Sequence, residues 1–115
     1  MLKIATILPY KENYTIKKAA AASLWVYDFF RHSSLRKNNY IFGSTDAKDF
    51  LSNNYINITI KDSNSKLAST TNHYCDGLIK KIDGKKFDII EIHNRPLVFN
   101  ILKKKLNSNF IIYFH

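Results

Sequence analysis

Cysteine, glycine and proline are scarce in this chain of 115 residues, which contains one, three and two of them respectively. The single cysteine, Cys75, cannot form an internal disulfide, and no spacing of cysteine and histidine resembles a zinc site, so we expect a reducing compartment. Low glycine and proline contents argue against linkers and against loop-rich all-β folds. No stretch reaches the roughly 20 apolar residues of a membrane span, and the N-terminal apolar run is too short for a signal peptide. The sequence therefore predicts a cytoplasmic protein.

Motifs for phosphate and nucleic-acid binding are missing as well. The chain has neither a Walker loop nor a G-x-G-x-x-G sequence, so we expect neither a P-loop hydrolase nor an ordinary dinucleotide-binding domain. It also has no RNA-binding, Cys/His or helix-turn-helix signature. We therefore do not expect sequence-specific binding to nucleic acid.

The composition is that of one globular domain with an excess of positive charge. The chain is 45% hydrophobic, 14% aromatic and 23% charged, and its formal net charge is +9. A basic surface attracts anionic ligands and anionic lipid surfaces. The lysines accompany many Asn, Ile, Tyr and Phe residues, however, and this bias is also expected of an AT-rich coding sequence. Both explanations account for the positive charge.

Five short apolar segments predict the strands of an α/β fold. The first is almost wholly apolar after Lys3, which is typical of a central parallel strand, and Pro9 is expected to end it. The second should follow a linker that closes with Asn38 and Asn39. The third alternates with period two, the pattern of an edge strand. The expected strands cover residues 2–8, 40–43, 55–60, 87–92 and 109–115.

Helical patterns occupy the intervals between these strands. The longest covers residues 17–33, and a brief helix is expected over residues 46–51, capped by Ser44 or Thr45. Residues 61–67 should form a loop, followed by a helix that ends at Gly84, a good left-handed stop signal, and by another over residues 97–106. The stripe of the first helix that we expect to be buried consists of Ala22, Trp25, Val26, Phe29 and Phe30.

This alternation predicts a Rossmann-like parallel sheet of about five strands with helices on both faces. Right-handed crossovers place the strands in the order 3-2-1-4-5. The winding reverses between the first and fourth strands, and ligands of such sheets bind at that point, beyond the carboxyl ends of the strands.

Polar residues gather where the fourth strand ends. Glu91 and His93 are two apart, so their side chains project to one face of the sheet. Asn94 is expected to cap the following helix, Pro96 suits its first turn, and Arg95 adds a cation where a helix N-terminus already favours anions. The cluster suits a phosphate or a sugar-phosphate.

Two further segments should reach the same edge of the sheet. The loop after the first strand brings Lys11, Glu12 and Lys17 to one side of the switch point. His115 ends the fifth strand, beside the fourth. Strand ends and helix N-termini converge at such an edge and offer backbone N–H groups to a ligand.

Residues 88–96, Asp-Ile-Ile-Glu-Ile-His-Asn-Arg-Pro, and residues 112–115, Ile-Tyr-Phe-His, resemble the N-terminal domain of GT-B glycosyltransferases of the GT4 type. Residues 4–9 look like the first strand of the bacterial polysaccharide and lipopolysaccharide members, residues 19–30 like their first helix, and residues 41–44 like their second strand. The resemblance covers the whole chain. Family members commonly carry glycine in the first loop, whereas this chain has none before Gly43.

The resemblance implies a hexosyltransferase of the retaining type, which moves a sugar from a nucleotide-sugar donor to a saccharide or lipid-linked acceptor without a metal or other cofactor. His115 and His93 would line the cleft as its catalytic residues. The residues implied to bind substrate or donor are Asn94, Arg95, Glu91, Lys11, Glu12 and Lys17.

The resemblance also implies that residues 1–115 form one N-terminal, acceptor-side domain of a two-domain enzyme. A second Rossmann-like domain would hold the donor, so we expect the chain to be a fragment that is inactive alone. The lysine-rich helices would offer peripheral contact with the cytoplasmic face of a membrane.

Two alternatives stand beside this interpretation. The first is a standalone flavodoxin-like module that binds a phosphorylated small ligand through Arg95 and a helix N-terminus. The second is a structural role in which the exposed fifth strand pairs with another chain.

Overall fold

Five strands form one parallel sheet in the computed structural model of the protein, which describes residues 2–60 and 67–115. The order β3-β2-β1-β4-β5 confirms the predicted topology, with its reversal between β1 and β4. The strands are β1 (Lys3–Tyr10), β2 (Asn38–Ser44), β3 (Tyr55–Asn57), β4 (Ile89–His93) and β5 (Asn109–Tyr113).

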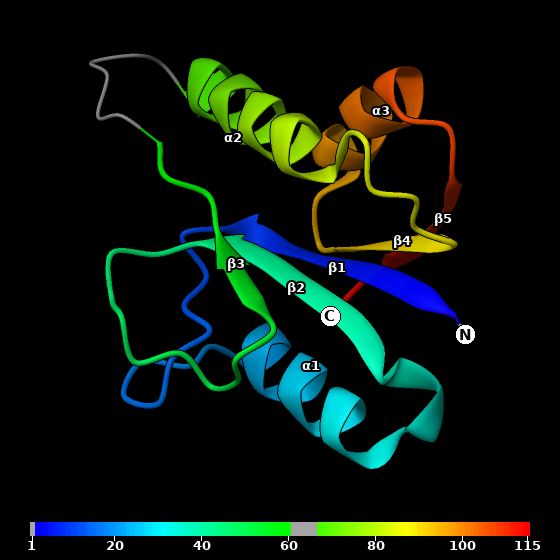
Figure 1. Ribbon diagram of the computed structural model, residues 1–115. Helices are drawn as coiled ribbons and strands as arrows, with labels where there is room; N and C mark the ends of the chain where they lie inside the picture. Colours follow the sequence, from blue (N-terminus) through cyan, green and yellow to red (C-terminus); the bar gives the residue numbers. More distant parts are fainter. Residues whose placement is uncertain (1, 61–66) are drawn as a thin grey trace.

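Within the described residues, helices cover both faces of the sheet, as predicted. Figure 1 shows α1 (Ala21–His32) on one face, and α2 (Leu67–Ile82) and α3 (Pro96–Lys105) together on the other. A short 3-10 helix, η1 (Ser34–Arg36), links α1 to β2. The architecture is therefore a Rossmann-like, parallel α/β domain.

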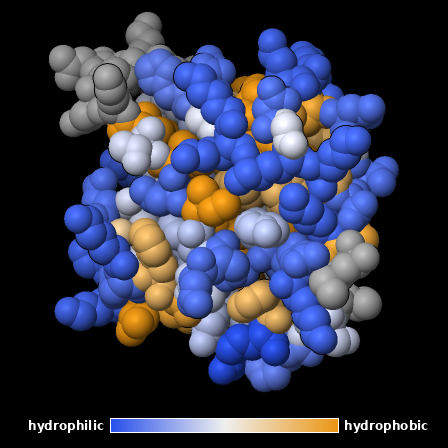
Figure 2. Space-filling view, viewed as in Figure 1, coloured by the Kyte–Doolittle hydropathy of each residue, from blue (hydrophilic) through white to orange (hydrophobic). Residues whose placement is uncertain are grey.

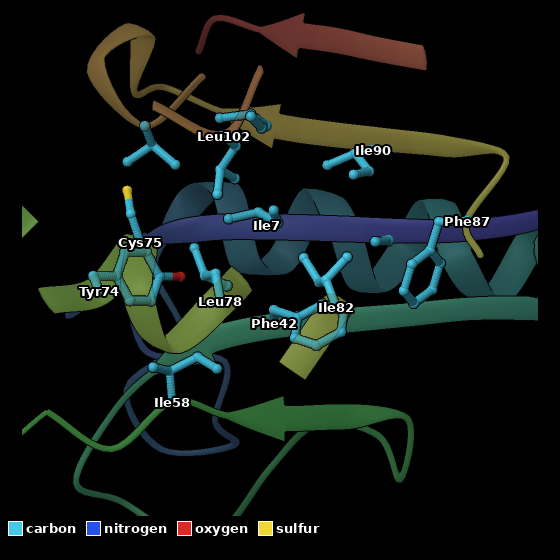
Figure 3. Close-up of a cluster of buried hydrophobic side chains, with 13 residues drawn as sticks. Ile7, Phe42, Ile58, Tyr74, Cys75, Leu78, Ile82, Phe87, Ile90 and Leu102 are labelled. Atoms are coloured by element: carbon cyan, nitrogen blue, oxygen red, sulfur yellow. The ribbon is translucent and has the colours of Figure 1, made fainter. Parts of the chain in front are cut away.

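Among residues 2–60 and 67–115, hydrophobic clusters lie between the sheet and the helices on each of its faces. The larger lies under α2 and α3, and Figure 3 shows side chains of both helices meeting those of β1, β2 and β4. The smaller lies on the other side and contains Leu8, Tyr14, Val26, Ile41 and Tyr55. On the outer surface, Figure 2 shows mainly hydrophilic side chains with separate hydrophobic patches.

The predicted ends of the first two strands are wrong. β1 continues through Pro9 to Tyr10, and its pairing with β2 shifts register between Ile7 and Tyr10. Proline lacks the N–H that a regular ladder needs, so it is accommodated in this irregular part. β2 already begins at Asn38, because the buried Asn39 amide donates hydrogen bonds to Thr6 Oγ1 at 2.9 Å and to a neighbouring strand carbonyl.

The brief helix predicted over residues 46–51 does not form. Thr45 Oγ1 accepts a hydrogen bond from the N–H of Ala47, which makes a local turn. The segment then pairs with the first loop, since Leu51 N–H donates to Tyr14 O at 3.2 Å and Ile16 N–H to Asp49 O at 2.9 Å. These bonds between distant residues replace the i to i−4 bonds of a helix.

The expectation for the first helix was partly wrong. α1 begins at Ala21 rather than at residue 17, because the preceding residues are tied to the 49–51 segment. Ala22 and Val26 are buried as predicted, but Phe29 is 41% exposed.

The predictions for the remaining elements also differ from the structure in detail. β3 ends at Asn57, before the predicted residue 60. β4 covers Ile89–His93 rather than residues 87–92, and β5 ends at Tyr113, so His115 lies two residues beyond the strand that it was predicted to end. Gly84 follows α2 with a φ of +81°, which confirms the stop signal. The loop predicted over residues 61–67 falls largely outside the described residues, and Leu67 is the first residue of α2.

Candidate functional site

The two histidines predicted at neighbouring strand ends meet in the structure. His93 is the last residue of β4 and pairs in register with Tyr113 of β5, two residues before His115. Nδ1 of His93 lies 2.7 Å from Nε2 of His115, and the two rings stack with their centroids 5.0 Å apart. Parallel pairing of β4 and β5 therefore brings the two imidazoles into hydrogen-bonding contact.

Asn94 holds the end of the chain in this position. Its side-chain Oδ1 accepts the backbone N–H of His115 at 2.7 Å, and its own N–H donates to Tyr113 O at 2.9 Å. Asn94 adopts a left-handed conformation with a φ of +58°, which asparagine tolerates better than most residues. The residue predicted to cap α3 thus fixes His115 instead.

Trp25 of α1 packs over both histidines. Its ring centroid lies 5.4 Å from that of His93, 5.4 Å from that of His115 and 5.2 Å from that of Tyr113. Tyr113 stacks on His93 with centroids 5.0 Å apart. We refer to Trp25, His93, Tyr113 and His115 as the histidine–tryptophan cluster. His93 is fully buried within it, whereas His115 is exposed.

Burial keeps His93 neutral at physiological pH. Loss of solvation lowers the pKa of His93 from 6.5 to about 4, and the adjacent His115 imidazole acts in the same direction. Within the described part of the chain, His93 Nε2 has no hydrogen-bond partner. A buried N–H without an acceptor is less favourable than an unpaired lone pair, so this geometry favours a proton on Nδ1, donated to His115 Nε2.

Glu91 lies deeper, in a buried ion pair. Its two carboxylate oxygens accept hydrogen bonds from the Arg36 guanidinium at 2.7 and 2.5 Å. Thr6 Oγ1 donates to Glu91 Oε1 at 2.9 Å, and the Tyr113 hydroxyl donates to Oε2 at 3.3 Å. Arg36 also lies over the Phe29 ring, 4.1 Å from its centroid. Glu91 is only 2% exposed, and it contacts the cluster through its hydrogen bond with Tyr113.

Arg95 stands at the N-terminus of α3, beside the cluster. It occupies the N-cap position without a side-chain cap, and Pro96 is the first helical residue, as predicted. The exposed guanidinium donates through Nη1 to Asn94 O at 2.9 Å. The predicted cap by Asn94 is wrong because its side chain faces the fifth strand.

The first loop does not bring its predicted residues to the histidines in a common site. Glu12 Oε1 accepts the N–H of Ala22 at 3.0 Å, so its carboxylate caps α1, whose N-cap residue is an alanine. The Lys17 N–H donates to Asp49 Oδ2 at 3.1 Å. Lys11 has a φ of +63° and lines a polar hollow that neither histidine borders.

Among residues 2–60 and 67–115, no group of three or more histidine, cysteine or carboxylate side chains is arranged to hold a metal ion. In the same part of the chain, every helix is too short or too polar to cross a membrane.

Sequence reasoning missed three side chains that shape this region. Arg36 gave no local signal, because its partner lies 55 residues away in the chain. Tyr113 could have been found, since it stands two residues before His115 as Glu91 stands before His93. The sequence predicts Trp25 only as part of the buried stripe of the first helix, and not that its ring packs against both histidines.

The residues and their geometry carry the functional case, because comparison of the chain with known proteins found no matching family model, no matching curated protein and no matching solved structure.

Proposed function

We propose that the chain is the acceptor-side, N-terminal half of a glycosyltransferase that uses a nucleotide-sugar donor and transfers the sugar to a saccharide or lipid-linked acceptor. The observation that carries the proposal is the contact between His93 and His115 at the carboxyl ends of β4 and β5. In parallel sheets this edge, next to the strand reversal, is where ligands bind. The enzyme would work in the cytoplasm, and this half alone would be inactive. The second half would hold most of the donor, while this half would contact the donor's sugar and phosphates across the cleft.

The proposal gives each part of the cluster a role at the donor sugar. The exposed His115 offers a ring nitrogen to a sugar hydroxyl. Trp25 stacks on Phe29 with centroids 4.9 Å apart and is half-buried, and it would offer the exposed part of its ring to the sugar. The neutral His93 positions His115 through the 2.7 Å hydrogen bond without adding charge. Arg95 and the N-terminus of α3 supply positive potential beside the sugar, where the donor phosphates would lie.

Thermal unfolding of the chain with a panel of UDP-glucose, UDP-N-acetylglucosamine and GDP-mannose tests this proposal. At least one donor should raise the midpoint of unfolding, because a ligand of the folded state stabilises it. The rise should disappear in His115→Ala and persist in Lys86→Gln, which removes an exposed charge in the loop before β4. If none of the donors raises the midpoint, or if both variants respond equally, the proposed site is wrong.

A second candidate is a standalone module for a phosphorylated small ligand. It is favoured by the exposed Arg95 and by the absence of a side-chain cap at the α3 N-terminus. Helix N-termini with a neighbouring cation bind anions. In this case inorganic phosphate should stabilise the chain as well as the nucleotide sugars do, and the effect should depend on Arg95 rather than on His115.

A further inference from the structure

A second concave surface lies apart from the histidine–tryptophan cluster. It is a hollow of about 610 Å³ at the carboxyl ends of β1, β2 and β3, lined by residues from three segments within 10–18, 44–47 and 57–60. Figure 1 shows the loops that follow β1 and β2 gathered at this end of the sheet. Its volume is within the range of pockets that hold small molecules.

Hydrogen bonds fix the walls of this hollow. The Thr45 N–H and the Tyr55 hydroxyl both donate to Asn57 Oδ1 at 2.9 Å. Ser44 Oγ donates to Ile58 O at 2.7 Å, and the Thr45 hydroxyl bonds to the Asn13 amide. A ligand would therefore meet side chains that are already oriented, which lowers the entropic cost of binding.

The chemistry of the walls selects a hydrophilic ligand. Amides and hydroxyls of Asn13, Thr45 and Asn57 border the space, together with the Tyr10 side chain. An apolar ligand would cover these polar groups without offering hydrogen bonds to those of their donors and acceptors that face water, at a cost in free energy. A ligand with several hydroxyls supplies those hydrogen bonds, and an aromatic side chain offers a surface to a sugar ring.

The charges at the hollow select an anionic group on that ligand. Lys11 and Lys18 both line it and are exposed, and Asp46 lines it with the opposite charge. The two ammonium groups outweigh the single carboxylate. The lysine ammonium is a compact charge on a flexible side chain, so it can reach a phosphate group held at the mouth of a pocket.

We propose that the hollow at the carboxyl ends of β1, β2 and β3 binds a phosphorylated saccharide. This inference goes beyond the proposed function because it assigns a second ligand site, away from the histidines. It does not depend on the transferase proposal. Within a transferase, the occupant of this hollow would be a phosphorylated acceptor.

NMR titration of the chain with glucose 6-phosphate tests the inference through backbone amide shifts. The perturbed amides should belong to residues 10–18, 44–47 and 57–60. Glucose and inorganic phosphate should each bind more weakly than glucose 6-phosphate, because each supplies only part of the recognised chemistry. Perturbation at the N-terminus of α3 instead, or at no residue at millimolar concentration, would overturn the inference.

Three charge variants sharpen the titration. Lys18→Gln should weaken binding of glucose 6-phosphate about two- to fivefold, the range for one exposed ion pair, and Asp46→Asn should strengthen it by a similar factor. Lys48→Gln is the matched control, since Lys48 is exposed on the same loop as Asp46 but does not line the hollow. Equal weakening by Lys18→Gln and Lys48→Gln would show only general attraction to a basic protein and would refute a built site.

The titration also separates this inference from the proposed function. Glucose 6-phosphate reports on the hollow, whereas the nucleotide sugars and His115→Ala report on the histidine–tryptophan cluster. Loss of one response with retention of the other identifies which of the two proposals has failed.

Discussion

Replacement of His93 by phenylalanine tests whether its imidazole is neutral in the folded protein. The ring stacks between Tyr113 and His115, and phenylalanine keeps an aromatic ring there while removing the titrating nitrogens. The folded-state pKa of about 4 lies below the unfolded value of 6.5. The unfolded chain therefore binds more protons in the window between these values, and the stability of the wild type should fall as pH is lowered through it.

The magnitude follows from the two pKa values. Between about pH 7 and about pH 5.5, the unfolded histidine becomes mostly charged while the folded one stays mostly neutral, which costs the wild type about 1.2 kcal/mol of unfolding free energy. His93→Phe should lack this part of the pH dependence. Its absolute stability can differ from that of the wild type, because only the change between the two pH values is compared.

Urea unfolding at the two pH values measures this difference. Trp25 is the only tryptophan and lies against His93, so its fluorescence reports unfolding, with circular dichroism as a second probe. Lys86→Gln, which removes an exposed charge in the loop before β4 and leaves His93 in place, should keep the pH dependence of the wild type. If His93→Phe loses as much stability as the wild type on acidification, His93 is not neutralised by burial and the reasoning fails.

Three further substitutions test the contacts around the site, each measured by chemical unfolding. Glu12→Ala should lower the free energy of unfolding by about 1 kcal/mol because it removes the oxygen that accepts the N–H of Ala22 at the start of α1. Glu12→Gln should cost less, because its amide oxygen can accept the same hydrogen bond. Equal losses in the two variants would argue against this hydrogen bond. Arg36→Met should lower the free energy of unfolding by about 3–5 kcal/mol, because it leaves the Glu91 carboxylate buried without its cation. A double variant that also carries Glu91→Met should recover most of that loss. A double variant as unstable as Arg36→Met would contradict a buried ion pair. Gly77→Ala should destabilise the protein despite alanine's higher helix propensity, since its Cβ would lie 2.4 Å from Ile58 Cγ2. A more stable Gly77→Ala variant would contradict that packing.

The topology and the meeting of the histidines could be predicted because both follow from regular rules. Apolar segments separated by helical patterns specify parallel strands, and right-handed crossovers then determine their order. His93 ends β4 and His115 lies two residues beyond the end of β5, so the order of these adjacent parallel strands brings both histidines to the same edge of the sheet.

Contacts between residues distant in sequence could not be predicted in the same way. The partner of Glu91 is Arg36, which lies in the short η1 helix outside any periodic pattern. The residues after Thr45 have local helix signals, but hydrogen bonds to the first loop override them. Asparagine is a common helix N-cap, yet the side-chain oxygen of Asn94 accepts a hydrogen bond from the backbone N–H of His115. In each case a tertiary partner determined the outcome, and a single sequence contains no direct record of such partners.

Saturation-transfer NMR on the chain with the donor that most raises its unfolding midpoint is the most direct test of the central claim. Irradiation of the protein's aromatic protons should transfer magnetisation most strongly to the sugar protons of the donor, because the proposal places that sugar against Trp25 and His115. The transfer should be lost in His115→Ala. Transfer to the nucleobase alone, or transfer unaffected by His115→Ala, would contradict a donor-sugar site at the histidine–tryptophan cluster.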